Sequence, residues 1–316
     1  MKTKVNSLVA LAAFLGLMLF SCGKDTPAPT AEIFATTDGY TVTFNPSVTD
    51  VSSYSWDFGD GETSTEAKPV HVYDQSGTYT VTLVVKGDGG EATATKQIEI
   101  AASLEEMLTG GPAATSGKTW VMSTDYNASE DGGGPVMNEM PVMLPSAENV
   151  LTLYGLGAEY DNEYTFFHNG SYSVNVKNGN ALAGAVYGAV TQTMVGDPSY
   201  DIGMCAATYT APASASWTLN TADFTVDAIT DPNTTDVPPA HDNVTFTGKN
   251  WIQLSEGAYF GILDLPSSPK FIIKEITASR MKVALFLCGY GYGEDPAMMA
   301  LPTNMIHISF VPKSSK

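Results

Sequence analysis

The sequence predicts an all-β protein with two domains, a small β-sandwich followed by a larger one. Turn-forming residues are abundant, with 29 Gly and 18 Pro among 316 residues. Short runs in which apolar and polar residues alternate recur along the chain, and this is the period of a half-buried strand. With 43% hydrophobic and only 16% charged residues the chain can fill buried cores, and its length fits about two domains.

The charge balance restricts the partners. The chain carries 34 acidic and 15 basic residues, a formal net charge of -19. A surface this negative repels phosphate backbones and anionic lipid head groups. Nucleic-acid binding and electrostatic membrane adhesion are therefore disfavoured, and neutral ligands remain open.

The N-terminus has the order of an export signal. Two lysines are followed by an apolar run at 8–20 that is short for a membrane span, and then by Ser21 and Cys22. Leu19-Phe20-Ser21-Cys22 resembles the bacterial lipobox, which implies a signal peptide at 1–21 and a lipid on Cys22. An ordinary secretory signal with a chance cysteine is the alternative.

A lipidated Cys22 implies a tethered protein. Residues 22–30 form the lipidated cysteine and a Thr- and Pro-containing tether, and Asp25 resembles the surface-export signals of Bacteroidetes lipoproteins. Acyl chains hold a protein at a membrane without embedding it. We therefore expect a lipid-anchored protein on the cell surface at the outer membrane.

The first domain is expected at 31–101. Strands with clear alternation are predicted around Tyr40–Phe44, Tyr54–Phe58 and Tyr79–Leu83. Between the second and third strands, the Asp-Gly pair within Gly59–Glu62 suits the positive φ angles of a tight turn. Repeated short strands and turns of this kind are typical of a sandwich.

The motifs of this domain identify its family. Tyr54–Gly61, Pro69–Tyr73 and Gly77–Leu83 closely resemble the PKD domain, an immunoglobulin-like module. The resemblance implies that Trp56 is a core residue and that the domain acts as a spacer or interaction platform. We expect His71 to be a strand residue, because no second His or Cys stands at metal-ligand spacing.

A linker is expected at 102–117 and a second domain at 118–316. Eleven short strands predict a β-sandwich of jelly-roll topology. They are Thr119–Met122, Val150–Tyr154, Glu163–Phe167, Tyr172–Val176, Ala215–Leu219, Asp223–Val226, Val244–Phe246, Trp251–Leu254, Phe271–Ile276, Lys282–Leu287 and Met305–Val311.

Scattered landmarks in the second domain resemble the glycan-binding domain of Bacteroidetes surface lipoproteins encoded beside polysaccharide-uptake systems. They include Gly117–Val121, Gly133–Pro135, Tyr160–Phe166 and Ser216–Leu219. The resemblance implies non-catalytic capture of a neutral polysaccharide, with a β-glucan such as laminarin favoured, for a neighbouring outer-membrane transporter. Where relatives carry an aromatic pair, this chain has Met140–Met143, so the ligand contact is lost or changed.

Strand parity selects candidate glycan contacts, because sugar rings stack on aromatic side chains of a solvent-facing sheet face. Ile252 and Leu254 are expected to face the core, which directs Trp251 and Gln253 outward. A Gly-Tyr-Gly-Tyr-Gly loop supplies two further tyrosines. The complete candidate set is Trp251, Gln253, Tyr290, Tyr292, Tyr160 and Tyr126. For Trp251 the alternative is packing under a loop.

Two other function classes stay open. Glu159, Asp161 and Glu163 would share one face of a strand, as the acid and nucleophile of a jelly-roll glycoside hydrolase require. A non-enzymatic adhesion protein is the third interpretation. No cofactor or metal is predicted, and the sequence leaves open whether Cys205 and Cys288 pair.

Overall fold

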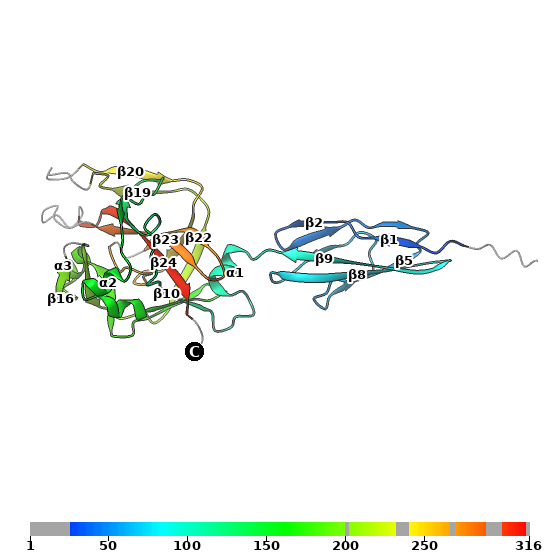
Figure 1. The fold of residues 1–316 in the computed structure, drawn as a ribbon, viewed down its shortest axis with the longest axis horizontal. Coiled ribbons are helices and arrows are strands. Elements are labelled where there is room, and N and C mark those ends of the chain that lie inside the picture. The colour runs from blue at the N-terminus through cyan, green and yellow to red at the C-terminus, as the bar shows by residue number, and fades with distance from the viewer. Residues whose placement is uncertain (1–25, 200–201, 232–239, 266–268, 289–298, 314–316) are drawn as a thin grey trace, which may run out of the picture. The chain divides into compact units, whose positions relative to one another are not determined.

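The computed structural model describes residues 26–199, 202–231, 240–265, 269–288 and 299–313. The chain divides into two compact units, the first of residues 1–72 and 78–98 and the second of residues 73–77 and 99–316 (Figure 1). The predicted signal peptide, Cys22, Tyr290 and Tyr292 lie outside the described residues.

The predicted small sandwich is present. One sheet has the order β2-β3-β7, another the order β6-β5-β8-β9, and β1 pairs with β4. The strands are β1 (Thr30–Glu32), β2 (Ala35–Asp38), β3 (Thr41–Phe44), β4 (Ser47–Thr49), β5 (Ser53–Asp57), β6 (Thr63–Ser64), β7 (Val70–Val72), β8 (Gly77–Gly87) and β9 (Gly90–Ile100).

The core of this sandwich is aromatic. Trp56 is buried, its ring lies 5.2 Å from that of Phe44, and its indole N–H donates to the Glu66 carbonyl at 2.9 Å. His71 on β7 stacks on Phe58 with ring centroids 4.0 Å apart, and its Nε2 is 2.7 Å from an Asp60 carboxylate oxygen. The structural roles predicted for Trp56 and His71 are thus confirmed.

The second unit is built on a closed, barrel-like sheet of eight antiparallel strands. The sheet order is β10-β13-β14-β18-β21-β22-β23-β24, and β24 pairs with β10 to close it. The strands are β10 (Lys118–Met122), β13 (Glu163–Phe166), β14 (Ser171–Asn175), β18 (Ala215–Asn220), β21 (Asn250–Leu254), β22 (Lys270–Ile276), β23 (Met281–Cys288) and β24 (Pro302–Pro312).

This connectivity corrects one detail of the expected fold. The all-β class and the order of the two domains are confirmed, but the closed sheet is an up-and-down meander and not a jelly roll. Each of these eight strands pairs with the next of the eight in chain order, other strands being inserted between some of them, so no Greek-key crossover forms among the eight.

Further elements lie beyond the eight closed strands (Figure 1), and two of them, β11 and β12, extend the same sheet from β24. On one side, β19 pairs with β20; on the other, α2, α3 and β16 lie near one another. These elements are β11 (Gly132–Pro135), β12 (Leu144–Pro145), β15 (Asn180–Gly184), β16 (Met194–Ser199), β17 (Met204–Thr208), β19 (Phe224–Ala228), β20 (Asp242–Phe246), α1 (Leu104–Thr109), α2 (Val150–Leu153), α3 (Ala185–Thr191) and the 3-10 helix η1 (Gly157–Asp161).

One expected strand is wrong. Val150–Tyr154 forms the short helix α2 and its end, not a strand. Tyr154 N–H bonds back to the Leu151 carbonyl, and the helical turn buries Leu151 in the core while it leaves Leu153 73% exposed. Periodicity alone does not distinguish so short an apolar run from a strand.

The closed sheet encloses an aromatic core. Trp120, Tyr164, Phe166 and Phe310 are fully buried. Residues 258–263, in the connection between β21 and β22, belong to the same core and contribute further buried rings. Tyr164 O–H donates to the carbonyl of Gly261 in this segment at 3.2 Å. The sheet interior is therefore packed with side chains.

The expected linker contains a helix that belongs to the second unit. The Ser103 side chain caps α1, and Gly110 ends it at φ 83°. Leu108 is fully buried in the core of the second unit, and its carbonyl accepts the Trp120 indole N–H at 2.9 Å. The second unit therefore begins before β10.

Candidate functional site

A cavity of ≈ 690 Å³ opens in the second unit where two strands diverge from β24. Asn304 to His307 pair with β11, whereas Phe310 to Pro312 pair with β10. The space between is walled by the loop after β10, by β12 and α2, and by the chain before β17. Ligand pockets of proteins commonly have this size.

The floor of the cavity is apolar. Its buried side chains are contributed by β10, α2, β15, β17 and β23, which are Met122, Leu151, Leu182, Met204 and Leu287. Ile306 and Ile308 of β24 line it as well. Residues far apart in the chain thus meet at one hydrophobic surface, because α2 and the β15–β17 pair lie against the closed sheet where β10 and β23 contribute Met122 and Leu287.

The rim combines aromatic and polar side chains. Tyr126 is half-buried and Tyr154 is 38% exposed, and the exposed Asp125 stands beside Tyr126 in the chain. Tyr160 is half-buried, and its hydroxyl accepts the Leu151 N–H at 3.4 Å. Burial raises the pKa of Tyr160, so it is a neutral phenol at physiological pH.

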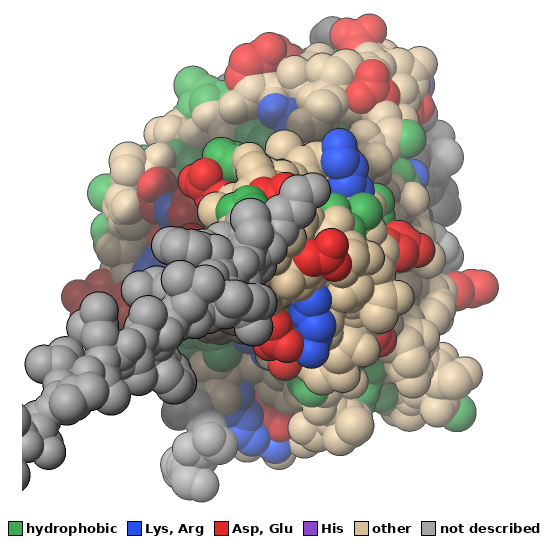
Figure 2. All heavy atoms as spheres, turned by 90° about the vertical axis from the view of Figure 1, so that its right-hand side faces the viewer, with side chains coloured by type: hydrophobic (Ala, Val, Ile, Leu, Met, Phe, Trp, Pro, Cys, Tyr) green, Lys and Arg blue, Asp and Glu red, His purple; other side chains and the backbone are tan. Residues whose placement is uncertain are grey.

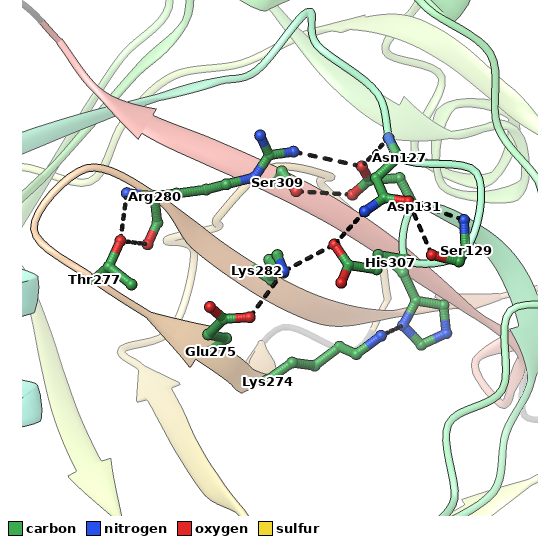
Figure 3. Close-up of polar contacts among 11 residues, drawn as sticks. Asn127, Ser129, Asp131, Lys274, Glu275, Thr277, Arg280, Lys282, His307 and Ser309 are labelled. Carbon is green, nitrogen blue, oxygen red and sulfur yellow. Dashed lines mark hydrogen bonds and ion pairs between the residues drawn. The ribbon is translucent and has the colours of Figure 1, made fainter.

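A polar network holds the wall that carries Tyr126 (Figure 3). The buried Asp131 carboxylate accepts from Ser309 Oγ at 2.8 Å and from the Asn127 N–H at 3.0 Å, and Arg280 lies 3.7 Å away. The Asp131 carbonyl accepts the Ser146 N–H at 3.0 Å. One residue thereby ties together the loop after β10, the chain after β12, β24, and the turn before β23.

A second set of charges lies beside this network on the outer face of β22–β24 (Figure 3). Lys282 bridges Glu130 and Glu275 at 2.8 Å each, and its hydrogen bond to Glu130 raises the Lys282 pKa. Lys274 donates to His307 Nδ1 at 3.2 Å. Burial and the Lys274 charge lower the pKa of His307 to about 4, so the ring is neutral at pH 7.

Tyr126 and Tyr160 are the two predicted contacts that the structure brings to this cavity. Tyr154, Leu144 and Leu153, also at its rim, were missed. Their exposure depends on the turn of α2 and on the short pairing of β12, neither of which leaves a periodic signal in the sequence.

Trp251 and Gln253 lie elsewhere, on the outer face of β21. Ile252 and Leu254 face the core, so the predicted parity is confirmed. The Trp251 indole N–H donates to the Ala222 carbonyl at 2.8 Å, and its ring lies 4.7 Å from that of Phe224 on β19. Trp251 is half-buried in a small outer cluster beside the β19–β20 pair.

The carboxylates of the hydrolase interpretation do not share a strand face. Glu159 and Asp161 belong to η1, and only Glu163 stands on a strand. Glu163 forms ion pairs with Lys177, at 2.8 Å, and with Lys313, which lower its pKa against the opposing effect of burial. Burial raises the pKa of Glu159. The alternation on which that interpretation depended is therefore absent.

The cysteines and the metal-ligand residues offer no second site within the described ranges. Cys205 and Cys288 are both buried free thiols. Among the described residues, His, Cys, Asp and Glu side chains do not gather in groups of three that would suit a metal ion. No helix in the described part of the chain has the length and hydrophobicity needed to span a membrane.

Comparison with known proteins identifies the first unit. Residues 26–102 match the family model for the PKD domain. The PKD1 domain of Vibrio anguillarum Epp is 35% identical over 24% of this chain and 98% of that domain, with a TM-score of 0.24. The PKD1 domain of the Vibrio cholerae metalloprotease PrtV is 37% identical over 24% of this chain and all of that domain, with a TM-score of 0.23. Residues 26–102 are therefore a PKD domain.

Matches to curated proteins are confined to a small part of each. Collagenase ColQ1 of Bacillus cereus is 61% identical over 41 residues, which are 13% of this chain and 4% of that enzyme. A structure described as a carbohydrate-binding module from the β-sandwich superfamily aligns with 92% of this chain and 94% of its own, at 13% identity and a TM-score of 0.24. A likeness this weak defines neither the fold nor the ligand of the second unit.

Proposed function

We propose that this chain is a non-catalytic, cell-surface lipoprotein that binds a neutral polysaccharide and delivers it to an outer-membrane uptake system. The observation that supports binding is the cavity of ≈ 690 Å³ with Tyr126 and Tyr154 at its rim. A β-glucan is the favoured ligand, on the resemblance of the second domain to surface glycan-binding domains.

The rim suits the two surfaces of a sugar ring. The C–H face of a pyranose packs on an aromatic ring, and each good aromatic contact contributes about 1 kcal/mol beyond its burial. Asp125, Ser146 and Asn304 line the same cavity and supply hydrogen-bonding groups for hydroxyls. Several weak contacts acting together fit a binding protein displayed in many copies.

The charge favours a neutral glycan over an acidic one. The net charge is -19, and Figure 2 shows acidic side chains interspersed with lysine, arginine and uncharged groups over one face of the molecule. A polyanion approaching such a surface is repelled, whereas a neutral chain is not.

The remaining parts of the proposal concern display. A lipid on Cys22 would anchor the chain, residues 22–30 would form the tether, and the PKD domain would act as a spacer that carries the second unit. These roles follow from the lipobox resemblance and from the usual use of PKD modules, which is an analogy at the level of the fold.

Affinity electrophoresis of residues 23–316 in gels with neutral polysaccharides tests the proposal. We expect retardation by a β-glucan, without release of reducing sugar, that the double substitution Tyr126→Ala/Tyr154→Ala abolishes. Phe34→Ala, which removes an aromatic side chain 50% exposed in the first unit, is the matched control and should not change it.

The other outcomes each identify another class. Release of reducing sugar would show a hydrolase and overturn the non-catalytic proposal. Absence of retardation by every glycan would leave adhesion as the better interpretation. Retardation that Trp251→Ala abolishes and the tyrosine pair does not would move the glycan site to the outer face of β21.

A further inference from the structure

The chemistry of the cavity floor differs from that of its rim. The floor residues Met122, Leu151, Leu182, Met204 and Leu287 are all apolar and are each less than 8% exposed. They approach one another from five different elements, so the apolar surface is continuous and not a single exposed side chain.

Most polar groups that border the floor already have partners, whereas His307 Nε2 is buried and has none among the described residues. Asp131 and Ser309 bond to each other, His307 accepts from Lys274, and the Tyr160 hydroxyl accepts the Leu151 N–H. Except beside His307 Nε2, a ligand hydroxyl pushed to the floor would lose its water without gaining an equivalent partner, and such burial is unfavourable. An unsubstituted sugar is therefore expected to stay at the rim.

The apolar surface continues outward from the cavity. Leu144 and Leu153 at the rim are 74% and 73% exposed, and Met143, next to Leu144 in the chain, is 67% exposed. Single exposed apolar residues are common on protein surfaces. Here large apolar side chains gather at the mouth of an apolar cavity, so the ligand has an apolar part as well as a sugar.

We propose that this cavity binds a sugar that carries a short apolar substituent, such as an acyl or alkyl group on a hydroxyl. The sugar ring lies against Tyr126 and Tyr154, and the substituent enters between Met204, Leu151 and Leu182. The exposed Asp125 at the rim disfavours a free fatty acid, because the two carboxylates would repel each other. This inference deepens the proposed glycan-binding function and rests on it.

Calorimetric titration of residues 23–316 with methyl, butyl and hexyl β-D-glucoside, all below micelle-forming concentrations, tests the substituent. We expect affinity to rise roughly two- to four-fold for each added methylene that the floor buries. Met204→Gln, which keeps the size of a floor side chain and makes it polar, should flatten this rise. Val195→Gln is the matched control, because Val195 is 40% exposed on β16 and outside the cavity.

A second variant, at the rim of the cavity, tests the inference even if Met204→Gln disturbs folding. Leu153→Gln changes a side chain that is largely exposed, so folding should be preserved, and we expect it to weaken hexyl glucoside more than methyl glucoside. Equal affinity for all three glucosides would overturn the inference, as would a rise with chain length that both Met204→Gln and Leu153→Gln leave intact.

The polysaccharide gels separate this inference from the proposed function. Retardation by polysaccharide together with equal affinities for the three glucosides would support glycan binding. It would reject the inference that the sugar carries an apolar substituent. The opposite result is an affinity that rises with alkyl chain length, a rise that Met204→Gln removes, and no retardation by any polysaccharide. It would support binding of a sugar with an apolar substituent and reject the proposal that the chain captures a polysaccharide.

Discussion

Ser309 Oγ donates a hydrogen bond of 2.8 Å to the carboxylate of Asp131, a residue 178 positions earlier in the chain. The bond joins β24, the last strand of the closed sheet, to the loop that precedes β11. Both groups are buried, so neither has water as a substitute partner. The position of Tyr126, five residues before Asp131, therefore depends on a contact made at the border of the same cavity.

Ser309→Ala should destabilise the second unit by about 1–3 kcal/mol, because it leaves one oxygen of a buried carboxylate without its donor. Urea denaturation measures this change in the free energy of unfolding. Glycan retardation should weaken as well, since the Tyr126 wall loosens. Glu275→Gln, at the exposed end of the Lys282 pair, is the control and should cost less than about 1 kcal/mol. An equal loss in both variants would contradict a special role for Ser309.

Trp251→Ala should lower stability and leave glycan binding unchanged. The side chain is half-buried against Phe224, so we expect a loss of about 1–3 kcal/mol, below the range for a fully buried Trp. Thermal or urea denaturation measures the first effect and affinity electrophoresis the second. Trp251→Phe, which retains most of the packing but not the N–H bond to Ala222, should lose less. Loss of binding at unchanged stability would show that Trp251 is a ligand contact.

Asp264 and His307 should give stability opposite pH dependences. Burial raises the pKa of Asp264 to about 7 against an ordinary value of 3.8, although the N–H groups of Cys288 and Leu265 donate to it. Its contribution to stability is full below pH 3.8 and is lost as pH rises to 7. The His307 pKa is lowered from 6.5 to about 4, so its contribution is full above pH 6.5 and is lost as pH falls to 4.

The two effects oppose each other between about pH 4 and 6.5. Asp264→Asn should therefore make stability rise more steeply with pH over that range, and His307→Gln should make it fall, each by at most about 1.4 kcal/mol per pH unit. Urea midpoints taken at half-unit steps of pH measure both slopes. Identical slopes in the two variants and the parent protein would refute the assignment.

Much of the fold followed from strand parity, because alternation reports which side chains a sheet buries. Ile252 and Leu254 face the core as the alternation in their strand predicted. β11 and β15 escaped detection because they are built largely from Gly and Ala, which carry little of the alternating signal. The closing contact of β10 with β24 joins residues almost 200 positions apart, and no local pattern encodes such a pairing.

The site was harder to predict than the fold. Parity identifies which residues face outward but not what covers them, so Trp251 was selected without knowledge that β19 packs beside it. The cavity depends on where β10 and β11 leave β24 and on the turn of α2. Tyr126 and Tyr160 were selected. Tyr154 was missed because its segment was expected to be a strand, whereas it forms the end of α2.

Leu108→Ala should destabilise the second unit by about 2–5 kcal/mol, the usual cost of a cavity left by a buried leucine. Leu108 lies in the segment expected as a linker, yet it is fully buried and its carbonyl accepts the Trp120 indole N–H. A flexible linker residue would tolerate this change with a loss below about 0.5 kcal/mol. Leu153→Ala, which removes the same atoms from a side chain 73% exposed, is the matched control. Comparison of the two by urea denaturation decides where the second unit begins: a large loss only at Leu108 assigns α1 to its core, whereas two small and equal losses would return the segment to the role of a tether.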